Sequence, residues 1–181
     1  MDRNDLIKKL LQADEDISMI YQGTDRIKVI LVGGSSFVLK QYINRQTPDI
    51  DTLGLYRELE AIFNKYDINS RANAYSDNLP YNYEDRLEKV DIKTKIIEYY
   101  VLSLEDAVIM KLFSHRGKDN DDITQPKVLS EINWQLLERI VSSGELDYSF
   151  DEKRLILFKS NYDKYVKAYK PKWESKTLKD I

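Results

Sequence analysis

The chain contains no cysteine and a single histidine, His115, among its 181 residues. Without thiols it can form no disulfide, zinc–thiolate site or cysteine nucleophile, and one histidine cannot supply a histidine-rich metal cage. Any bound catalytic metal must therefore be held by oxygen ligands, which favours Mg²⁺ or Mn²⁺. The lone histidine follows an apolar run, a position more typical of a capping or surface residue than of a general base.

Long apolar runs are also missing. No stretch approaches the ~18 apolar residues that a membrane span requires. The first residues, MDRNDLIKKLLQADED, carry charges where a secretory signal needs an uninterrupted apolar segment. We therefore expect a cytoplasmic protein with no membrane partner. The length suits one ordinary domain with a hydrophobic core, or a compact domain with a helical extension.

Charge is unevenly distributed along the chain. The net charge is -3, yet residues 153 to 181 hold nine basic and only three acidic side chains. If a polyanion binds, this C-terminal segment is the expected contact. Lysines also flank a stripe of aromatic residues with helical spacing there: Phe158, Tyr162, Tyr165 and Tyr169. We favour packing of that stripe on the domain, which leaves the lysines as a candidate RNA-facing surface.

Hydrophobic periodicity predicts mixed secondary structure. Amphipathic spacing indicates a helix from residue 3 to about 20, ended by Gly23, and RIKVILVGG reads as a buried strand. The predicted elements that follow are a helix in SSFVLKQYI capped by its serines, a strand in DIDTLGL, a helix in YRELEAIFNKYD, strands in EKVDIKT and IIEYYVL, a helix from Ser103 to about Ser114, and helices at 127–142 and 151–169.

This order of elements favours the α+β (α/β) class, with a small mixed sheet flanked by helices and a helical C-terminal part. We expect residues 1–123 to form the α/β core with its N-terminal helix. Residues 124–181 are expected to form a helical extension packed on that core.

A glycine pair and an acidic pair mark the first candidate site. Gly33 and Gly34 allow a ligand to approach the backbone closely, and Ser35 and Ser36 follow where a helix would begin. In the next strand Asp49 and Asp51 point to the same face, where two carboxylates can share a divalent cation. An isolated Asp-x-Asp is also common on solvated strand faces; the neighbouring glycine turn makes the combination far more specific.

The segments GGSS and RQTPDIDTL resemble the signature of the nucleotidyltransferase superfamily typified by DNA polymerase beta. LPYNYEDRL, YYVLSLEDAVIMKL and HRGKDNDDI are similar to segments of bacterial nucleotidyltransferase-like proteins related to abortive-infection toxin–antitoxin nucleotidyltransferases. The resemblance covers residues 29 to about 123 and, more weakly, the segment INWQLLERI. It implies that the aspartates bind Mg²⁺ or Mn²⁺, that the Gly-Ser turn holds a nucleoside triphosphate, and that a later lysine and aspartate complete the site.

Lys111 matches that lysine. It interrupts an otherwise apolar helical stripe in AVIMKLF, so it needs a buried partner or must extend to water. Asp119 and Asp122, three residues apart, are candidates on one helical face, although acids in a first helical turn are ordinary capping residues. Arg45 matches the family's R-x-T-x-D run and is a candidate phosphate donor, with a surface arginine as the alternative. Arg116 is a further candidate.

The third carboxylate is ambiguous. Related polymerase-like enzymes carry another acid on an adjacent strand, and here Asp91 in KVDIK competes with Glu98 in IIEYY. A solvated strand face explains both residues equally well.

Together these features predict a metal-dependent nucleotidyltransferase that moves a nucleoside monophosphate from a nucleoside triphosphate to an acceptor hydroxyl of tRNA, a protein or a small molecule. The resemblance also implies a cognate toxin or antitoxin partner. The alternative is a catalytically silent nucleotide-binding or protein-interaction module on the same fold.

Overall fold

The computed structural model describes residues 1–146 and 152–177, and side chains up to residue 170. The chain divides into two compact units. Unit 1 comprises Met1–Ser76 and Glu84–Ser103, and unit 2 comprises Asp77–Tyr83 and Leu104–Ile181. The expected organisation into residues 1–123 and 124–181 stays a prediction.

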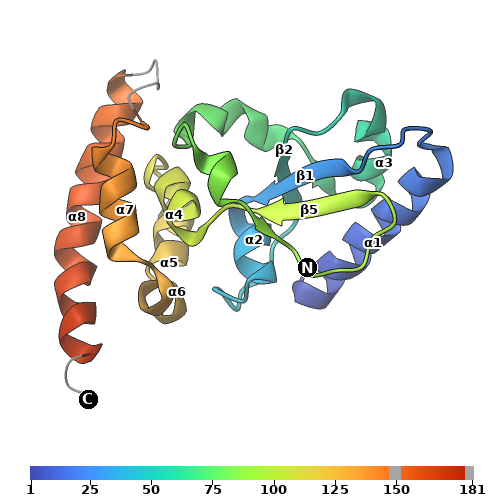
Figure 1. Cartoon of the computed structure of the whole chain (residues 1–181). Helices are drawn as coiled ribbons and strands as arrows, with labels where there is room; N and C mark the ends of the chain where they lie inside the picture. The colour runs from blue at the N-terminus through green and yellow to red at the C-terminus, as the bar shows by residue number, and fades with distance from the viewer. Residues whose placement is uncertain (147–151, 178–181) are drawn as a thin grey trace. The chain divides into compact units, whose positions relative to one another are not determined.

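Unit 1 is built on a five-stranded mixed sheet with the order β3-β2-β1-β5-β4 (Figure 1). β1 pairs parallel with β5 and antiparallel with β2, while β3 and β4 form the edges. The strands are β1 (Ile27–Val32), β2 (Ile50–Leu53), β3 (Ile68–Asn69), β4 (Glu88–Lys89) and β5 (Ile97–Val101). The helices of this part of the chain are α1 (Arg3–Ile20), α2 (Gly33–Leu39), α3 (Glu60–Lys65) and the 3₁₀ turns η1 (Arg57–Leu59), η2 (Arg71–Asn78) and η3 (Tyr83–Arg86). The predicted α+β class is confirmed.

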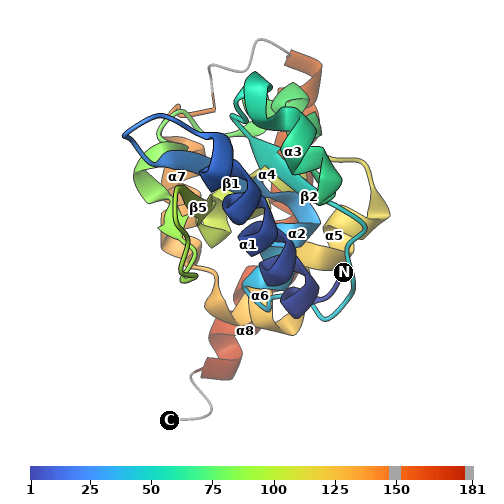
Figure 2. The same cartoon turned by 90° about the vertical axis from the view of Figure 1, so that its right-hand side faces the viewer.

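α1 covers one face of this sheet, as Figure 2 shows. Its buried residues include Leu6, Leu10 and Ile17. The hydroxyl of Tyr99 in β5 donates to the carbonyl of Leu10 at 2.9 Å. Burial, with the nearby charge of Asp14, raises the pKa of Tyr99, so the hydroxyl stays a donor. The apolar spacing of the sequence therefore packs α1 against the central strands.

A buried carboxylate fixes α1 to the start of β5. Asp14 is 3% exposed and accepts hydrogen bonds from the amides of Lys95, Ile96 and Ile97, at 2.6, 3.0 and 2.8 Å. Three amide donors compensate for the loss of water around one carboxylate. The charge of Asp14 is therefore balanced by backbone amides, and the residue has a structural role.

Unit 2 is helical. Its helices are α4 (Leu104–Leu112), α5 (Gly117–Ile123), α6 (Pro126–Glu131), α7 (Trp134–Ser142) and α8 (Glu152–Thr177). Phe158 of α8 is fully buried and stacks on Phe113 with ring centroids 4.6 Å apart. The hydroxyl of Tyr165 donates to the carbonyl of Ile123 at 2.8 Å. The aromatic stripe thus packs inside its own unit at these two positions.

Several predicted elements need correction. The helix expected at 127–142 is two helices, because Asn133 caps α7 through its side chain while its amide donates to Glu105 at 2.7 Å. α8 continues to Thr177 rather than ending at 169, and the expected start at residue 151 lies outside the described residues. EKVDIKT contributes only the two residues of β4. α1 ends at Ile20, before Gly23, with Tyr21 as its C-cap.

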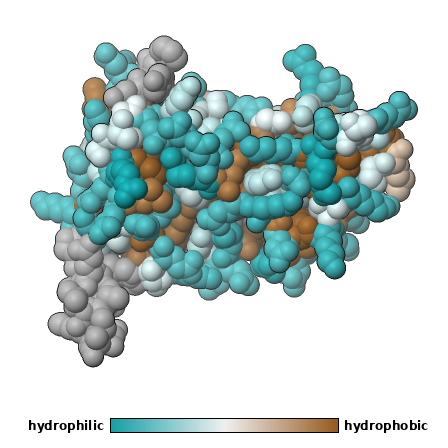
Figure 3. Space-filling model, viewed as in Figure 1, coloured by the Kyte–Doolittle hydropathy of each residue, from teal (hydrophilic) through white to brown (hydrophobic). Residues whose placement is uncertain are grey.

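The space-filling view shows mostly hydrophilic side chains on the visible face (Figure 3). The most exposed large hydrophobic side chains among the described residues include Met19 at 70%, Ile156 at 68% and Tyr81 at 67%. Single exposed apolar residues of this kind are common on protein surfaces. In the part of the chain that is described, no helix combines the length and apolar character needed to cross a bilayer.

Candidate functional site

The glycine turn, Gly33–Gly34, lies where β1 ends and α2 begins. Val32 is extended, and Gly33 has φ +66°, a left-handed conformation that glycine adopts readily. β2 runs antiparallel to β1 and pairs Asp51 with Val32. This register carries the Asp51 side chain to the turn from the neighbouring strand.

Asp51 lies in contact range of the first glycine. A Cβ atom added at Gly33 would lie 3.1 Å from Oδ2 of Asp51. A Cβ atom added at Gly34 would lie 3.0 Å from Nη2 of Arg45 and 3.3 Å from Oγ1 of Thr47. A carboxylate therefore borders the first glycine, and a guanidinium and a hydroxyl border the second. Both charged groups come from residues that the sequence singled out.

Asp49 precedes β2 and is partly solvent-exposed. Its side chain is 31% exposed, and Oδ2 lies 3.5 Å from Nη1 of Arg71, a long contact for an ion pair. Its carbonyl accepts a hydrogen bond from the Thr47 hydroxyl at 3.2 Å. Arg71 was missed by the sequence analysis, because no local pattern links it to an acid 22 residues earlier.

The serines do not cap α2 as expected. The N-cap residue is Val32, because the glycines already form the first turn of the helix. Ser35 Oγ donates to the carbonyl of Val32 at 2.9 Å, and Ser36 Oγ donates to the carbonyl of Gly33 at 2.8 Å. Both serines are buried, so their hydroxyl protons serve to hold the turn itself.

The two third-acid candidates lie away from the glycine turn. Glu98 of β5 lies opposite Lys28 of β1. Lys28 precedes Val32 by four residues, so Glu98 lies about 13 Å along the strand from the glycine turn. Hydrogen bonds from Lys89 and Tyr100, with the charge of Arg26, hold the pKa of Glu98 below its usual value. Asp91 is exposed. It follows β4, where Lys89 pairs with Tyr100 and the Val90 amide donates to the Tyr99 carbonyl. The structure therefore brings neither residue to Asp51.

Unit 2 contains a buried ionic cluster formed by Lys111, Asp119 and Asp122, here called the Lys111 cluster. Lys111 Nζ donates to Asp119 Oδ1 and to Asp122 Oδ2, each at 2.8 Å. The side chains of Lys111, Asp119 and Asp122 are 6%, 6% and 2% exposed. Arg116 donates through Nε to the other oxygen of Asp119 at 2.7 Å. The predicted buried partner of Lys111 is thus the pair of aspartates on α5.

The Asp119 carboxylate stays ionised despite its burial. Burial acts to raise the pKa of Asp119, but the charge and hydrogen bond of Lys111, with hydrogen bonds from Ser114 and Arg116, outweigh it and lower the pKa. A cluster of this kind stabilises α4 against α5. Lys111 and its aspartates all belong to unit 2, whereas the glycine turn and Asp49, Asp51 and Arg45 all belong to unit 1.

Among the described residues, no group of three or more His, Asp or Glu side chains is arranged to hold a metal ion. Asp51 is the carboxylate that lies at the glycine turn, and Asp49 comes two residues earlier, just before β2. Protein sites for Mg²⁺ commonly use one or two carboxylates together with substrate phosphates. The two aspartates of unit 1 suit a Mg²⁺ site of this kind, in which substrate phosphates supply the remaining ligands.

A comparison with protein-family models matches residues 8–170 to a family described as a nucleotidyltransferase of unknown function (DUF6036). The match covers both the glycine turn and the Lys111 cluster. Comparisons with curated proteins and with solved structures gave no match.

Proposed function

The chain belongs to the family of nucleotidyltransferases of unknown function (DUF6036), and from that premise we propose that unit 1 binds a nucleoside triphosphate at the glycine turn and transfers its nucleoside monophosphate to an acceptor hydroxyl. The observation that carries the proposal is the approach of Asp51 to Gly33, where a Cβ atom would lie 3.1 Å from the carboxylate. A phosphate chain on the turn would therefore lie beside an acidic group.

Asp49 and Asp51 are the residues that would hold Mg²⁺ or Mn²⁺ in this site. Such an ion would neutralise charge on the phosphoryl oxygens and help to orient the reacting groups. Asp51 comes from a paired strand and its position is therefore fixed by the sheet. Asp49 is exposed enough to exchange its long contact with Arg71 for another cation.

The groups around the second glycine would bind the phosphates. Gly34 presents no side chain, so phosphate oxygens can reach the backbone there. Arg45 lies beside this position, and a guanidinium can donate two parallel hydrogen bonds to a phosphate. Ser35 and Ser36 act as positioning residues, because their hydroxyls hold the carbonyls of Val32 and Gly33.

The acceptor is proposed by chemical class as a hydroxyl of RNA, a protein or a small molecule. Attack of that oxygen on the α-phosphorus forms the new phosphate ester and releases pyrophosphate, and the hydroxyl proton passes to solvent. A place in a toxin–antitoxin pair is a further proposal, which depends on the resemblance of the sequence segments alone.

One observation favours a second candidate, a nucleotide-binding module without turnover. Neither Asp91 nor Glu98 lies at the glycine turn, so unit 1 offers two acids there where polymerase-like relatives use three. Such a module would bind a triphosphate with the same residues and transfer nothing.

The test incubates the purified chain with each labelled nucleoside triphosphate, Mg²⁺ and total RNA, beside Asp51→Asn. Asp25→Asn is the matched control, because Asp25 is an exposed acid before the other end of β1. We expect label transfer by the wild type and Asp25→Asn, and a loss of at least about 100-fold in Asp51→Asn, as is typical when one electrostatic group of a transition state is removed. Binding that Asp51→Asn weakens, without transfer by any variant, supports the second candidate. Equal transfer by all three proteins would overturn the proposal.

A further inference from the structure

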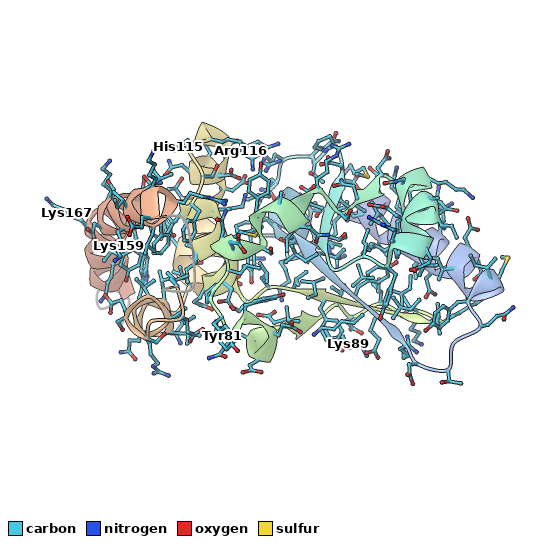
Figure 4. All side chains as sticks on the ribbon, turned by 90° about the horizontal axis from the view of Figure 1, so that it is seen from above. Tyr81, Lys89, His115, Arg116, Lys159 and Lys167 are labelled. Atoms are coloured by element: carbon cyan, nitrogen blue, oxygen red, sulfur yellow. The ribbon has the colours of Figure 1, made fainter. Side chains whose placement is uncertain are left out.

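Unit 2 has a pocket of about 370 Å³ that the proposed function does not use. It lies between the α4–α5 loop and one face of α8. The loop contributes His115 and Arg116, and α8 contributes Asn161, Lys164 and Tyr169. Figure 4 shows His115 and Arg116 projecting side by side from that loop.

The charged side chains that line this pocket are the cations Lys111, Arg116 and Lys164. Among the described residues its lining includes no acidic side chain. The acids of the Lys111 cluster are at most 6% exposed, and they hold Lys111, which lines the pocket. Asp119 also holds Arg116 through Nε, while the Arg116 side chain remains 78% exposed. The buried carboxylates thus orient two cations and leave their own charge away from solvent.

Lys164 adds a cation from a different element. It is exposed, and it makes no ion pair or side-chain hydrogen bond within the described part of the chain. A guanidinium held by Asp119 and an ammonium from α8, both on the lining of one pocket, suit a phosphate, which can accept a forked pair of hydrogen bonds and interact with a point charge. Arg116 and Lys164 therefore favour the binding of an anionic group.

The remaining wall is apolar. Ile123, Ala168 and Tyr169 line it, and the Tyr169 ring is held by Tyr165 with centroids 5.4 Å apart. The volume is near the lower end of the ~300–1,000 Å³ typical of small-ligand pockets. We propose that this pocket binds a small phosphomonoester that carries a ring, with its phosphate at Arg116 and Lys164 and its ring against Tyr169.

The single histidine gives a local probe of this site. Because the chain has one histidine and it lines the pocket, its imidazole proton resonance is assigned without ambiguity. The full-length chain is titrated with inorganic phosphate and, separately, with phenyl phosphate, at constant ionic strength and pH and without nucleotide or metal. We expect saturable shifts of the His115 signal, with tighter binding of phenyl phosphate.

The test uses substitutions in the α4–α5 loop and in α8, so that a folding defect in one variant does not decide the result. Arg116→Gln and Lys164→Gln should each weaken phenyl phosphate binding by about tenfold, the change expected for one lost charge-assisted contact. Lys159→Gln is the matched control, because Lys159 is an exposed α8 lysine outside the pocket lining. It should bind like the wild type.

Three results would overturn the inference: a shift that chloride reproduces, equal affinities for phosphate and phenyl phosphate, or equal weakening by Lys164→Gln and Lys159→Gln. The inference goes beyond the proposed function, since nothing in this titration depends on Asp51 or on nucleotidyl transfer. Failure of either proposal therefore leaves the other to its own test.

Discussion

In unit 1 the Asp51 carboxylate lies beside a glycine turn and Asp49 is 31% exposed, whereas in unit 2 Asp119 and Asp122 are 6% and 2% exposed and both accept hydrogen bonds from Lys111. The four residues have the same side chain. Their surroundings differ: the acids of unit 2 are paired with a buried cation, whereas within the described residues the Asp49 carboxylate makes a long contact with Arg71. The comparison separates acids that are paired with a buried cation from acids that lie beside the glycine turn or partly in solvent, and the proposed function assigns a ligand to the second group alone.

The largest expected effect comes from removing the buried cation, Lys111. Lys111→Met should lower the free energy of unfolding by about 3–5 kcal/mol, because two buried carboxylates lose the charge and hydrogen bonds of Lys111. Urea unfolding followed by tryptophan fluorescence measures the change. Lys118→Met is the control, since Lys118 is exposed on α5 and forms no ion pair within the described residues. A loss no greater than that of the control would contradict a stabilising role for the Lys111 cluster.

Asp14 extends the contrast into unit 1, because it is a buried acid there with a structural role. Asp14→Ala should cost about 2–3 kcal/mol, since three amides of residues 95–97 lose their acceptor. Glu15→Ala, at the next position of α1, breaks only an exposed pair with Lys95 and should cost at most about 1 kcal/mol. Equal losses in the two variants would show that Asp14 does not anchor β5.

A pair of glycine substitutions sharpens the assignment of the glycine turn. Gly33 and Gly54 both have positive φ, +66° and +72°, but only a Cβ at Gly33 would meet another residue within 4 Å, the side chain of Asp51. Both Gly→Ala changes should therefore lose about 1–2 kcal/mol of stability from backbone strain. Only Gly33→Ala should also lose label transfer. Loss of transfer in both variants, or in neither, would contradict a role for the Asp51–Gly33 contact.

The smallest effect concerns pH. The pKa of Asp119 is lowered in the folded chain from its ordinary value of 3.8, so its stabilising contribution is present above that pH and is lost as pH falls through the folded value. Unfolding free energies of the wild type should fall as pH is lowered from 5 to below 3.8. Asp119→Asn should show a shallower fall, and Asp25→Asn the wild-type slope. An unchanged slope in Asp119→Asn would contradict the lowered pKa.

The local features of the candidate site were open to prediction from sequence. The β-branched run ending at Gly33 and the Asp-x-Asp pair were predicted from neighbouring residues and strand alternation, although Asp49 lies just before β2. Arg45 was a candidate because its R-x-T-x-D run resembles that of the family. The apolar stripe around Lys111 also predicted that a buried lysine needs a partner.

Long-range contacts were not predictable in the same way. Asp14 looks like any acid in a surface helix, and its amide partners lie 81 to 83 residues away. The break before α7 depends on Glu105, 28 residues before Asn133. The serines looked like helix caps because the glycines were read as a turn before the helix rather than as its first residues.

The most direct test of the central claim is Mn²⁺ binding, measured by electron paramagnetic resonance in the presence of a non-hydrolysable nucleoside triphosphate. If Asp49 and Asp51 hold the ion beside the glycine turn, the wild type and Asp25→Asn bind Mn²⁺ alike, and Asp51→Asn binds at least about tenfold more weakly. Equal Mn²⁺ affinity in Asp51→Asn and the wild type would contradict the account.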